Sequence, residues 1–204
     1  MRLEAEYTAK DNRLFTLDGK EILLADMMRA EAAMICGKEL EPGARRKMIS
    51  ELTASNYKPL CVYLPWFLVE ASPETYNEAL LASLRDFLKE IETDNLHAII
   101  VPQPDDDSSP VPLIHYGKLV PESASLFTAA MKHTARRIKD CSSVIGFAIP
   151  RELLLNGLAS GSPASVYMSE LAEKHEQYVF FASQADILAA KCADAVKATP
   201  IVLY

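Results

Sequence analysis

Aromatic and charged side chains follow two of the apolar runs in the sequence, just after each run ends. Trp66 and Glu70 come after LCVYL, and Arg151 and Glu152 come after VIGFAI. A carboxyl group can donate or accept a proton at a reacting bond, and the flat face of an indole can stack on the apolar face of a sugar ring. We therefore take Glu152, together with Trp66, Glu70 and Arg151, as candidate site residues.

A third apolar run, LHAIIV, leads into a polar stretch that contains His115 and Tyr116. We predict that both side chains lie at the same end of the sheet as the first group and contact a ligand. Asp105, Asp106 and Asp107 lie in the same stretch. An acidic loop beside Ser-Ser-Pro is typically solvated, so no metal site is predicted.

Each of these residues also has an interpretation without a ligand. Trp66, the only tryptophan, can be a hydrophobic side chain at a rim or an interface, and Glu70 can be an ion-pair partner in a loop. Glu152 can cap the following helix or pair with Arg151. A carboxyl acts as a general acid near neutral pH when burial or a like charge raises its pKa, whereas a neighbouring arginine acts in the opposite direction.

Short apolar runs without in-and-out alternation are expected to be parallel strands that are buried on both faces. The run at Leu23–Met28 is expected to begin the series, and the run at Ile201–Tyr204 ends it. Arg13–Leu24 contains two shorter runs around Asp18-Gly19, a dipeptide that suits a two-residue turn, so an N-terminal β-hairpin is predicted there. The other predicted strands are Leu60–Leu64, Leu96–Val101 and Val144–Ile149.

Helical patterns separate the predicted strands. Leucine and phenylalanine recur on one face across residues 80–91, and a similar apolar face runs through residues 127–138. Residues 45–54 make a shorter helix. Ser162-Pro163 is typical of a helix start and opens a long segment that reaches Ala189, which we interpret as one bent helix or as two.

Strands and helices alternate, so the predicted fold class is α/β with right-handed crossovers. Two architectures fit this order: a doubly wound open sheet, and a (β/α) barrel of the TIM type. No Gly-rich phosphate loop follows the first strand, and the chain has only 7 glycines, which disfavours the nucleotide-binding versions of the open sheet. We therefore predict a single domain over residues 1–204, a partial or reduced TIM barrel of about five parallel strands preceded by the hairpin.

Composition disfavours several classes of function. The 21 Lys and Arg against 28 Asp and Glu give a net charge of −7, and no basic stripe is present, so nucleic acid is a poor partner. No apolar run is long enough to span a membrane, and the N-terminus lacks the apolar core of a signal peptide, so a cytoplasmic protein is predicted. The four cysteines are widely spaced, which predicts reduced thiols and neither a zinc site nor disulfides. No cofactor is predicted.

The stretch WFLVEASPETYN, residues 66–77, resembles the pattern W-x-x-H-E-x-x-P-x-G-x-Y-[DN] of clan A retaining glycoside hydrolases, most closely their β-galactosidase-like members. Val69 stands in place of the histidine. LFTLDGKEILL resembles the hairpin before the first barrel strand in cellulase-like and galactosidase-like relatives, and LRDFLKEIETDNLHAIIVPQP resembles their following helix and third strand. RRIKDCSSVIGFAIPREL resembles the end of their fourth strand. Together these stretches cover most of residues 13–155.

The resemblance implies a TIM barrel whose acid/base is the glutamate after strand four. Glu152 occupies that place, with Arg151 in place of the usual asparagine. Retaining hydrolysis needs a second carboxyl, which in this clan comes from strand seven, and no residue of this sequence matches it. We therefore expect a glycoside-hydrolase-like protein that acts on or binds β-linked glycosides, with hydrolysis left open. The alternative is a non-catalytic relative that binds a glycan or forms a homo-oligomer, because the outer strands of a five-stranded sheet are open edges.

Overall fold

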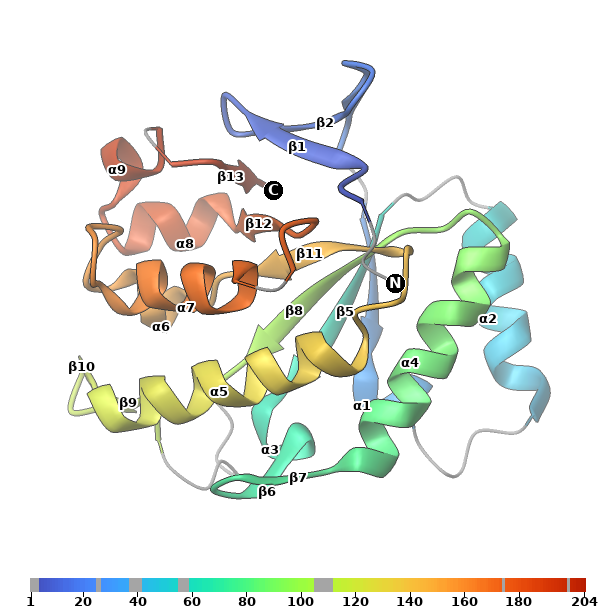
Figure 1. The fold of residues 1–204 in the computed structure, drawn as a ribbon, viewed down its shortest axis with the longest axis horizontal. Coiled ribbons are helices and arrows are strands. Elements are labelled where there is room, and N and C mark those ends of the chain that lie inside the picture. The colour runs from blue at the N-terminus through green and yellow to red at the C-terminus, as the bar shows by residue number, and fades with distance from the viewer. Residues whose placement is uncertain are drawn as a thin grey trace.

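The computed structural model describes residues 4–24, 27–36, 42–54, 59–104, 112–173, 175–197 and 199–204. In this part of the chain, six strands form one sheet in which every neighbouring pair is parallel (Figure 1). Their order across the sheet is their order in the sequence. The strands are β4 (Met28–Glu31), β5 (Leu60–Pro65), β8 (Ala98–Gln103), β11 (Val144–Ala148), β12 (Val179–Ala182) and β13 (Ile201–Leu203).

Helices fill the connections between these strands, and a side chain caps the start of α4 (Glu78–Thr93) and of α7 (Pro163–Ala172). The side chain of Asn77 accepts a hydrogen bond of 3.1 Å from the backbone nitrogen of Leu80, and Ser162 caps the backbone nitrogen of Ser165 in the same way. The long helices are α2 (Pro42–Ala54), α4 (Glu78–Thr93), α5 (Pro121–Arg137) and α7 (Pro163–Ala172). The short ones are α1 (Ala32–Ile35), α3 (Trp66–Val69), α6 (Arg151–Leu154), α8 (Gln184–Ala189) and α9 (Ala193–Lys197).

The two faces of the sheet are covered by different elements, and this decides between the two predicted architectures. Side chains such as Val62 and Ile100 pack with the buried faces of the helices in one apolar cluster. Side chains of the opposite parity, such as Cys61 and Ile99, form a second cluster that contains no helix residue among its buried members. A doubly wound sheet has helices on both faces, whereas a barrel keeps them outside. The described chain is therefore an open, barrel-like α/β sheet of six strands, and the barrel is not closed.

A small antiparallel sheet at the N-terminus covers part of the inner face. It contains β1 (Tyr7–Lys10), β2 (Arg13–Thr16) and β3 (Glu21–Ile22), and Leu14 of β2 is buried in the inner apolar cluster. The strands β2 and β3 correspond to the predicted hairpin over residues 13–24. The turn between them is longer than the predicted two residues, because Thr16 pairs with Lys20 and leaves three residues between them.

A tight turn of this N-terminal sheet reaches the far edge of the large sheet. Asn12 has a left-handed backbone conformation, with φ of 59°. Its side-chain nitrogen donates to the carbonyl oxygens of Ile201 at 2.8 Å and of Val196 at 3.1 Å, and its carbonyl oxygen accepts from the backbone nitrogen of Leu203 at 3.0 Å. The first hairpin is thereby fixed to β13, as the blue and red ends of the chain in Figure 1 indicate.

Two predictions about the strands are wrong. Residues 179–182 form β12, whereas the sequence analysis placed them in a long helix. The run YVFFA is rich in aromatic and β-branched side chains, and burial between β11 and β13 favours the extended conformation. The first strand begins at Met28, whereas Leu23 is exposed and lies before it. The sheet accordingly has six strands where five were expected.

Gly146 allows β11 and β12 to approach each other closely. A Cβ atom at this position would lie 1.7 Å from the carbonyl oxygen of Val179. The same residue follows an irregularity in the pairing of β11 with β8. Only glycine fits this point of contact, and it lies in the strand that leads to Arg151 and Glu152 of the candidate site.

No helix in the described ranges is both long enough and apolar enough to cross a membrane.

Two short antiparallel strand pairs lie in the connections between the strands of the large sheet. One pair is β6 (Glu70–Ser72) with β7 (Thr75–Tyr76), and the other is β9 (Ile114–His115) with β10 (Lys118–Leu119).

Candidate functional site

A pocket of about 240 Å³ lies at the carboxyl edge of the large sheet. It is lined by the last residues of β8, by the segment that follows β11, and by side chains that follow β12 and β13. Ligands of parallel sheets and barrels bind at this edge. The polar residues that line the pocket are Gln103, Arg151, Glu152, Asp186 and Tyr204.

Glu152 is placed in this pocket by the way β11 ends. β11 ends at Ala148; Pro150 has no backbone N–H to donate to the sheet, and α6 starts at the next residue. Glu152 lies in the first turn of that helix and is only 7 % exposed, whereas the side chain of Arg151 is 54 % exposed. The Nε atom of Arg151 lies 3.7 Å from Oε1 of Glu152. The pocket thus contains a nearly buried carboxyl beside a half-exposed guanidinium.

Asp186 and Tyr204 line the same pocket, and the sequence analysis missed both. Asp186 lies in the first turn of α8, which follows β12. The backbone of Tyr204 makes two hydrogen bonds where β12 leads into α8. Its nitrogen donates to the carbonyl oxygen of Ala182 at 3.1 Å, and its carbonyl oxygen accepts from the backbone nitrogen of Gln184 at 2.9 Å. The run VFFA, read as a strand, is the signal that places Asp186 at the carboxyl edge.

Next to the pocket, the inner face carries a polar group on the first two strands. The guanidinium of Arg29 lies 3.9 Å from the ring centroid of Tyr63, and its Nε donates to Glu31 at 2.6 Å. Burial raises the pKa of the Tyr63 hydroxyl, and the charge of Arg29 lowers it in part. The charges of Cys61, Glu31 and Asp186 add to the rise in this pKa.

Trp66 does not lie in the pocket. It is 1 % exposed, and its ring meets the ring of Phe127 edge to face at a centroid distance of 5.5 Å. Its indole nitrogen donates to Glu70, which is also 1 % exposed and accepts a second hydrogen bond from the backbone nitrogen of Glu74. The predicted roles of Trp66 as a stacking platform and of Glu70 as a ligand contact do not fit this burial. Trp66 packs α3 against α5, and Glu70 joins α3 to the turn between β6 and β7.

His115 and Tyr116 lie outside the pocket as well. They form the tip of the β9–β10 hairpin, where their rings meet at a centroid distance of 4.2 Å and Tyr116 is 92 % exposed. Neither residue lines the pocket that contains Glu152. Of the predicted site residues, the structure therefore brings together Arg151 and Glu152 alone.

The acidic loop at Asp105, Asp106 and Asp107 lies outside the described residues. Within the described ranges, no group of three or more His, Cys, Asp or Glu side chains is placed to hold a metal ion. The four cysteines are free and buried. The pocket's chemistry in this part of the chain therefore comes from carboxyl, guanidinium, amide and phenol groups.

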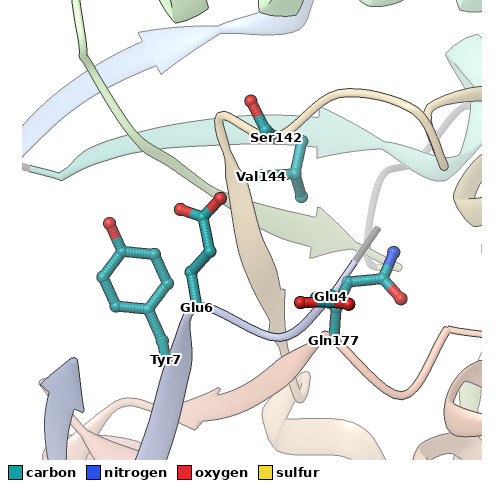
Figure 2. Close-up of a pocket in the computed structure, with 6 residues that line it drawn as sticks. All are labelled: Glu4, Glu6, Tyr7, Ser142, Val144 and Gln177. Atoms are coloured by element: carbon teal, nitrogen blue, oxygen red, sulfur yellow. The ribbon is translucent and has the colours of Figure 1, made fainter. Parts of the chain in front are cut away.

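Two other hollows do not compete with this site. Figure 2 shows one at the opposite edge of the sheet, between the N-terminal segment and the turns before β11 and β12. It is lined by Glu6, Tyr7 and Gln177 among others, and its volume of about 10 Å³ holds one water at most. The second is a groove of about 570 Å³ between α4 and α5, on the outer helical layer, where Arg85 pairs with Asp140 and where Arg136, Arg137 and Lys139 also line the surface.

The fold is TIM-barrel-like, because six parallel strands lie in sequence order and the helices cover one face of the sheet. The candidate site lies at the carboxyl edge and contains a carboxyl that follows the fourth strand. No protein-family model matches the sequence, and no curated protein matches it. Solved structures do match.

A GH5_18 protein from Streptomyces cattleya in complex with Manβ1-4GlcNAc matches with a TM-score of 0.58 at 10 % identity, over 78 % of this chain and 44 % of that chain. An endocellulase from Pyrococcus horikoshii matches with a TM-score of 0.58 at 11 % identity, over 87 % of this chain and 56 % of that chain. A GH5_18 protein from Bifidobacterium longum subsp. infantis matches with a TM-score of 0.54 at 7 % identity, over 76 % and 43 % of the two chains.

These matches confirm the resemblance in fold to clan A glycoside hydrolases. The chain spans about half the length of the solved structures that it matches. At this level of identity the likeness concerns the fold alone, so the activity and the ligand are matters of proposal.

Proposed function

We propose that this chain binds β-linked glycosides in the pocket at the carboxyl edge, with Glu152 in the position of the acid/base. The observation that carries the proposal is the place of Glu152: a nearly buried carboxyl, directly after the fourth strand, in a sheet whose fold is that of glycoside hydrolases. A general acid for glycosidic bonds needs a partly desolvated carboxyl at the substrate.

The other polar side chains of the pocket suit a sugar. Gln103 offers an amide that can donate and accept, and Tyr204 offers a phenol. Proteins similar in fold were solved with β-linked sugars, Manβ1-4GlcNAc in one case and cellotetraose in another. These two oligosaccharides are therefore the first ligands to test.

Calorimetric titration of the full chain with cellotetraose and with Manβ1-4GlcNAc tests the binding. We expect one site, and we expect weaker binding by Glu152→Ala, because the substitution removes the carboxyl that would hydrogen-bond to the sugar. Glu51→Ala, on the exposed face of α2, is the matched control and should bind as the wild type does. Absence of binding for both sugars overturns the proposal.

A second function is favoured by the edges of the sheet. In the described part of the chain, β4 pairs with one neighbour only, whereas Asn12 of the first hairpin covers part of the outer edge of β13. An unpaired strand edge can recruit another strand, so we propose self-association as the alternative role. Light scattering on the eluting protein at micromolar concentration tests it, and a monodisperse monomer overturns it.

A further inference from the structure

The strand β4 forms one edge of the large sheet, and within the described ranges it pairs with β5 alone. The opposite edge is different. There Asn12 donates to the carbonyl oxygen of Ile201 and accepts from the backbone nitrogen of Leu203, so backbone groups of β13 are already bonded. A strand edge with unpaired backbone groups is a template for another strand, and in the described part of the chain β4 is that edge.

Two opposite charges lie on the same face of β4. Arg29 and Glu31 are two positions apart, so both side chains point to the inner face, and Nε of Arg29 donates to Glu31 at 2.6 Å. The guanidinium lies 3.9 Å from the ring centroid of Tyr63 on β5. The side chains of Arg29 and Glu31 are 60 % and 33 % exposed. Because a guanidinium has five N–H groups, Arg29 keeps donors for a second carboxylate.

The sequence of β4, Met-Arg-Ala-Glu, is complementary to itself in one antiparallel register. In this register a two-fold axis passes through the position of Ala30. Arg29 of one copy then lies opposite Glu31 of the second copy, and the axis repeats the same pair on its other side. Side chains that lie opposite each other in an antiparallel pair share a face, with Cβ atoms about 4.5–5.5 Å apart, so these opposite charges attract.

Other registers bring like charges together. An axis at Arg29 places the two arginines opposite each other, and an axis at Glu31 does so for the two glutamates. A parallel pairing in register places like charges side by side at both positions. Like charges that face each other destabilise a strand pair, so the charges of β4 disfavour these registers and favour the one centred on Ala30.

The surroundings of β4 leave room for this contact. The helix α1 begins at the residue after β4, and its Met34 is 68 % exposed, which offers apolar area for a second copy to bury. The pocket that contains Glu152 has no lining residue on β4. Pairing through β4 therefore leaves the pocket of each copy accessible.

We propose that two copies of this chain associate through their β4 strands, antiparallel, with the two-fold axis at Ala30 and two reciprocal ion pairs between Arg29 and Glu31. The inference rests on the proposed self-association and specifies its edge and its register. The partner is thus a second copy of this chain, and the contact continues the large sheet from one copy into the other.

Charge exchange between two variants of the full chain tests the contact. Arg29→Glu alone and Glu31→Arg alone each place like charges opposite each other twice, so the Kd of the dimer should rise at least about 10-fold. Light scattering on the eluting protein and sedimentation equilibrium measure this change. An equimolar mixture of the two variants restores opposite charges in both pairs, and a heterodimer should form as readily as the wild-type dimer.

Two further kinds of variant complete the test. The double variant Arg29→Glu/Glu31→Arg exchanges both charges within one chain and should dimerise as the wild type does. Lys47→Glu and Glu51→Arg make the same charge changes on the exposed face of α2 and should leave the dimer unchanged. Recovery in the mixture separates the contact between copies from the bond within one copy, because mixing does not restore the bond between residues 29 and 31 of the same chain.

The possible results separate this inference from the proposed functions. A wild-type monomer at micromolar concentration overturns both the β4 contact and self-association, and it leaves glycoside binding standing. A wild-type dimer whose single variants dimerise equally well, or whose variants do not recover on mixing, overturns the β4 contact and leaves self-association through another surface. Calorimetry of the Arg29→Glu variant with cellotetraose tests the pocket separately, since no residue of β4 lines it.

Discussion

The indole nitrogen of Trp66 donates a hydrogen bond of 2.6 Å to Oε2 of Glu70, and both side chains are fully buried. The other carboxylate oxygen accepts from the backbone nitrogen of Glu74, which has a left-handed φ of 63°. A buried carboxylate needs such donors, since an unpaired one costs several kcal/mol. The pair therefore fixes α3 to the turn between β6 and β7, one connection away from the pocket.

Trp66→Phe should destabilise the protein by about 2 kcal/mol, because it removes a donor from a buried charged acceptor. Glu70→Gln keeps an acceptor oxygen for one of the two hydrogen bonds and places its amide N–H group against the other donor, so it should also be destabilising. The free energy of unfolding in urea measures both effects. Equal stability of Trp66→Phe and the wild type would mean that Glu70 does not depend on the indole.

Gly146→Ala should cost about 3 kcal/mol or more, because the new methyl group collides with the backbone of β12. Gly43→Ala serves as the opposite case. Gly43 lies in α2 with no atom within 4 Å of the added Cβ, so alanine should stabilise the helix by about 0.5–1 kcal/mol. Thermal unfolding of the two variants compares them directly, and shifts of the same sign would contradict the close contact of the strands.

Arg151→Asn should raise the rate of glycoside hydrolysis by a few fold, if Glu152 is the acid that we propose. The positive charge at 3.7 Å favours the ionised form of the carboxyl, and its removal favours the proton-bearing form that an acid requires. Arg151→Lys keeps a positive charge and should behave as the wild type. Rates on 4-nitrophenyl β-glycosides between about pH 5 and 8 measure the effect, and a lower rate for the asparagine variant would show that Arg151 itself contacts the sugar.

Stability should fall at alkaline pH because of the buried thiols. Burial raises the pKa of Cys36 and of Cys61 from 9.0 to about 11. The folded state keeps these thiols neutral while the unfolded state can ionise them, so the stabilisation is fully present below about pH 9 and is lost as the pH rises toward 11. At pH 10.5 we expect a loss on the order of 1–2 kcal/mol per thiol relative to pH 7, measured by urea unfolding.

Cys61→Ala tests the origin of this alkaline effect. The variant should be less stable at pH 7, because it leaves a small cavity in the inner apolar cluster, but it should lose less stability between pH 7 and pH 10.5. The native protein should also react with a thiol reagent at pH 8 only after it is unfolded. An identical pH dependence of wild type and variant would assign the effect to other groups.

The alternation of strands and helices was readable from the sequence because the central strands β5, β8 and β11 lie in apolar runs. Residues 60–65 and 144–148 appear as strands almost as predicted, and Ser162 caps α7 as its sequence context indicates. The error at residues 179–182 arose because a short apolar run inside helical periodicity fits either conformation. Tertiary contacts decide such cases, and here β11 and β13 hold the run extended on both sides.

The sequence predicted a site residue correctly only where that residue directly follows a recognisable strand. Arg151 and Glu152 follow a recognisable strand, so their place at its carboxyl end was clear. Trp66 follows a strand in the same way, but whether its ring points outward or into the core depends on α5, which lies about 60 residues later. The spacing of four residues between Trp66 and Glu70 was the one local signal that they bond to each other. Asp186 was hidden by the misassigned strand before it.

The contact between Asn12 and Ile201 of β13 can form only late in synthesis of the chain. A ribosome releases the first hairpin long before it adds Ile201, which lies 189 positions later. Until then the turn at Asn12 lacks its hydrogen-bond partners on β13. The contact that helps to hold Leu14 in the inner apolar cluster with Cys61 is therefore not yet formed. Contacts so distant along the chain close slowly, since the loop entropy is lost before they form. The hairpin can therefore dock on β13 only after the last strand has been synthesised. Before that moment the inner apolar face is exposed, and binding of a chaperone to it would be of most use.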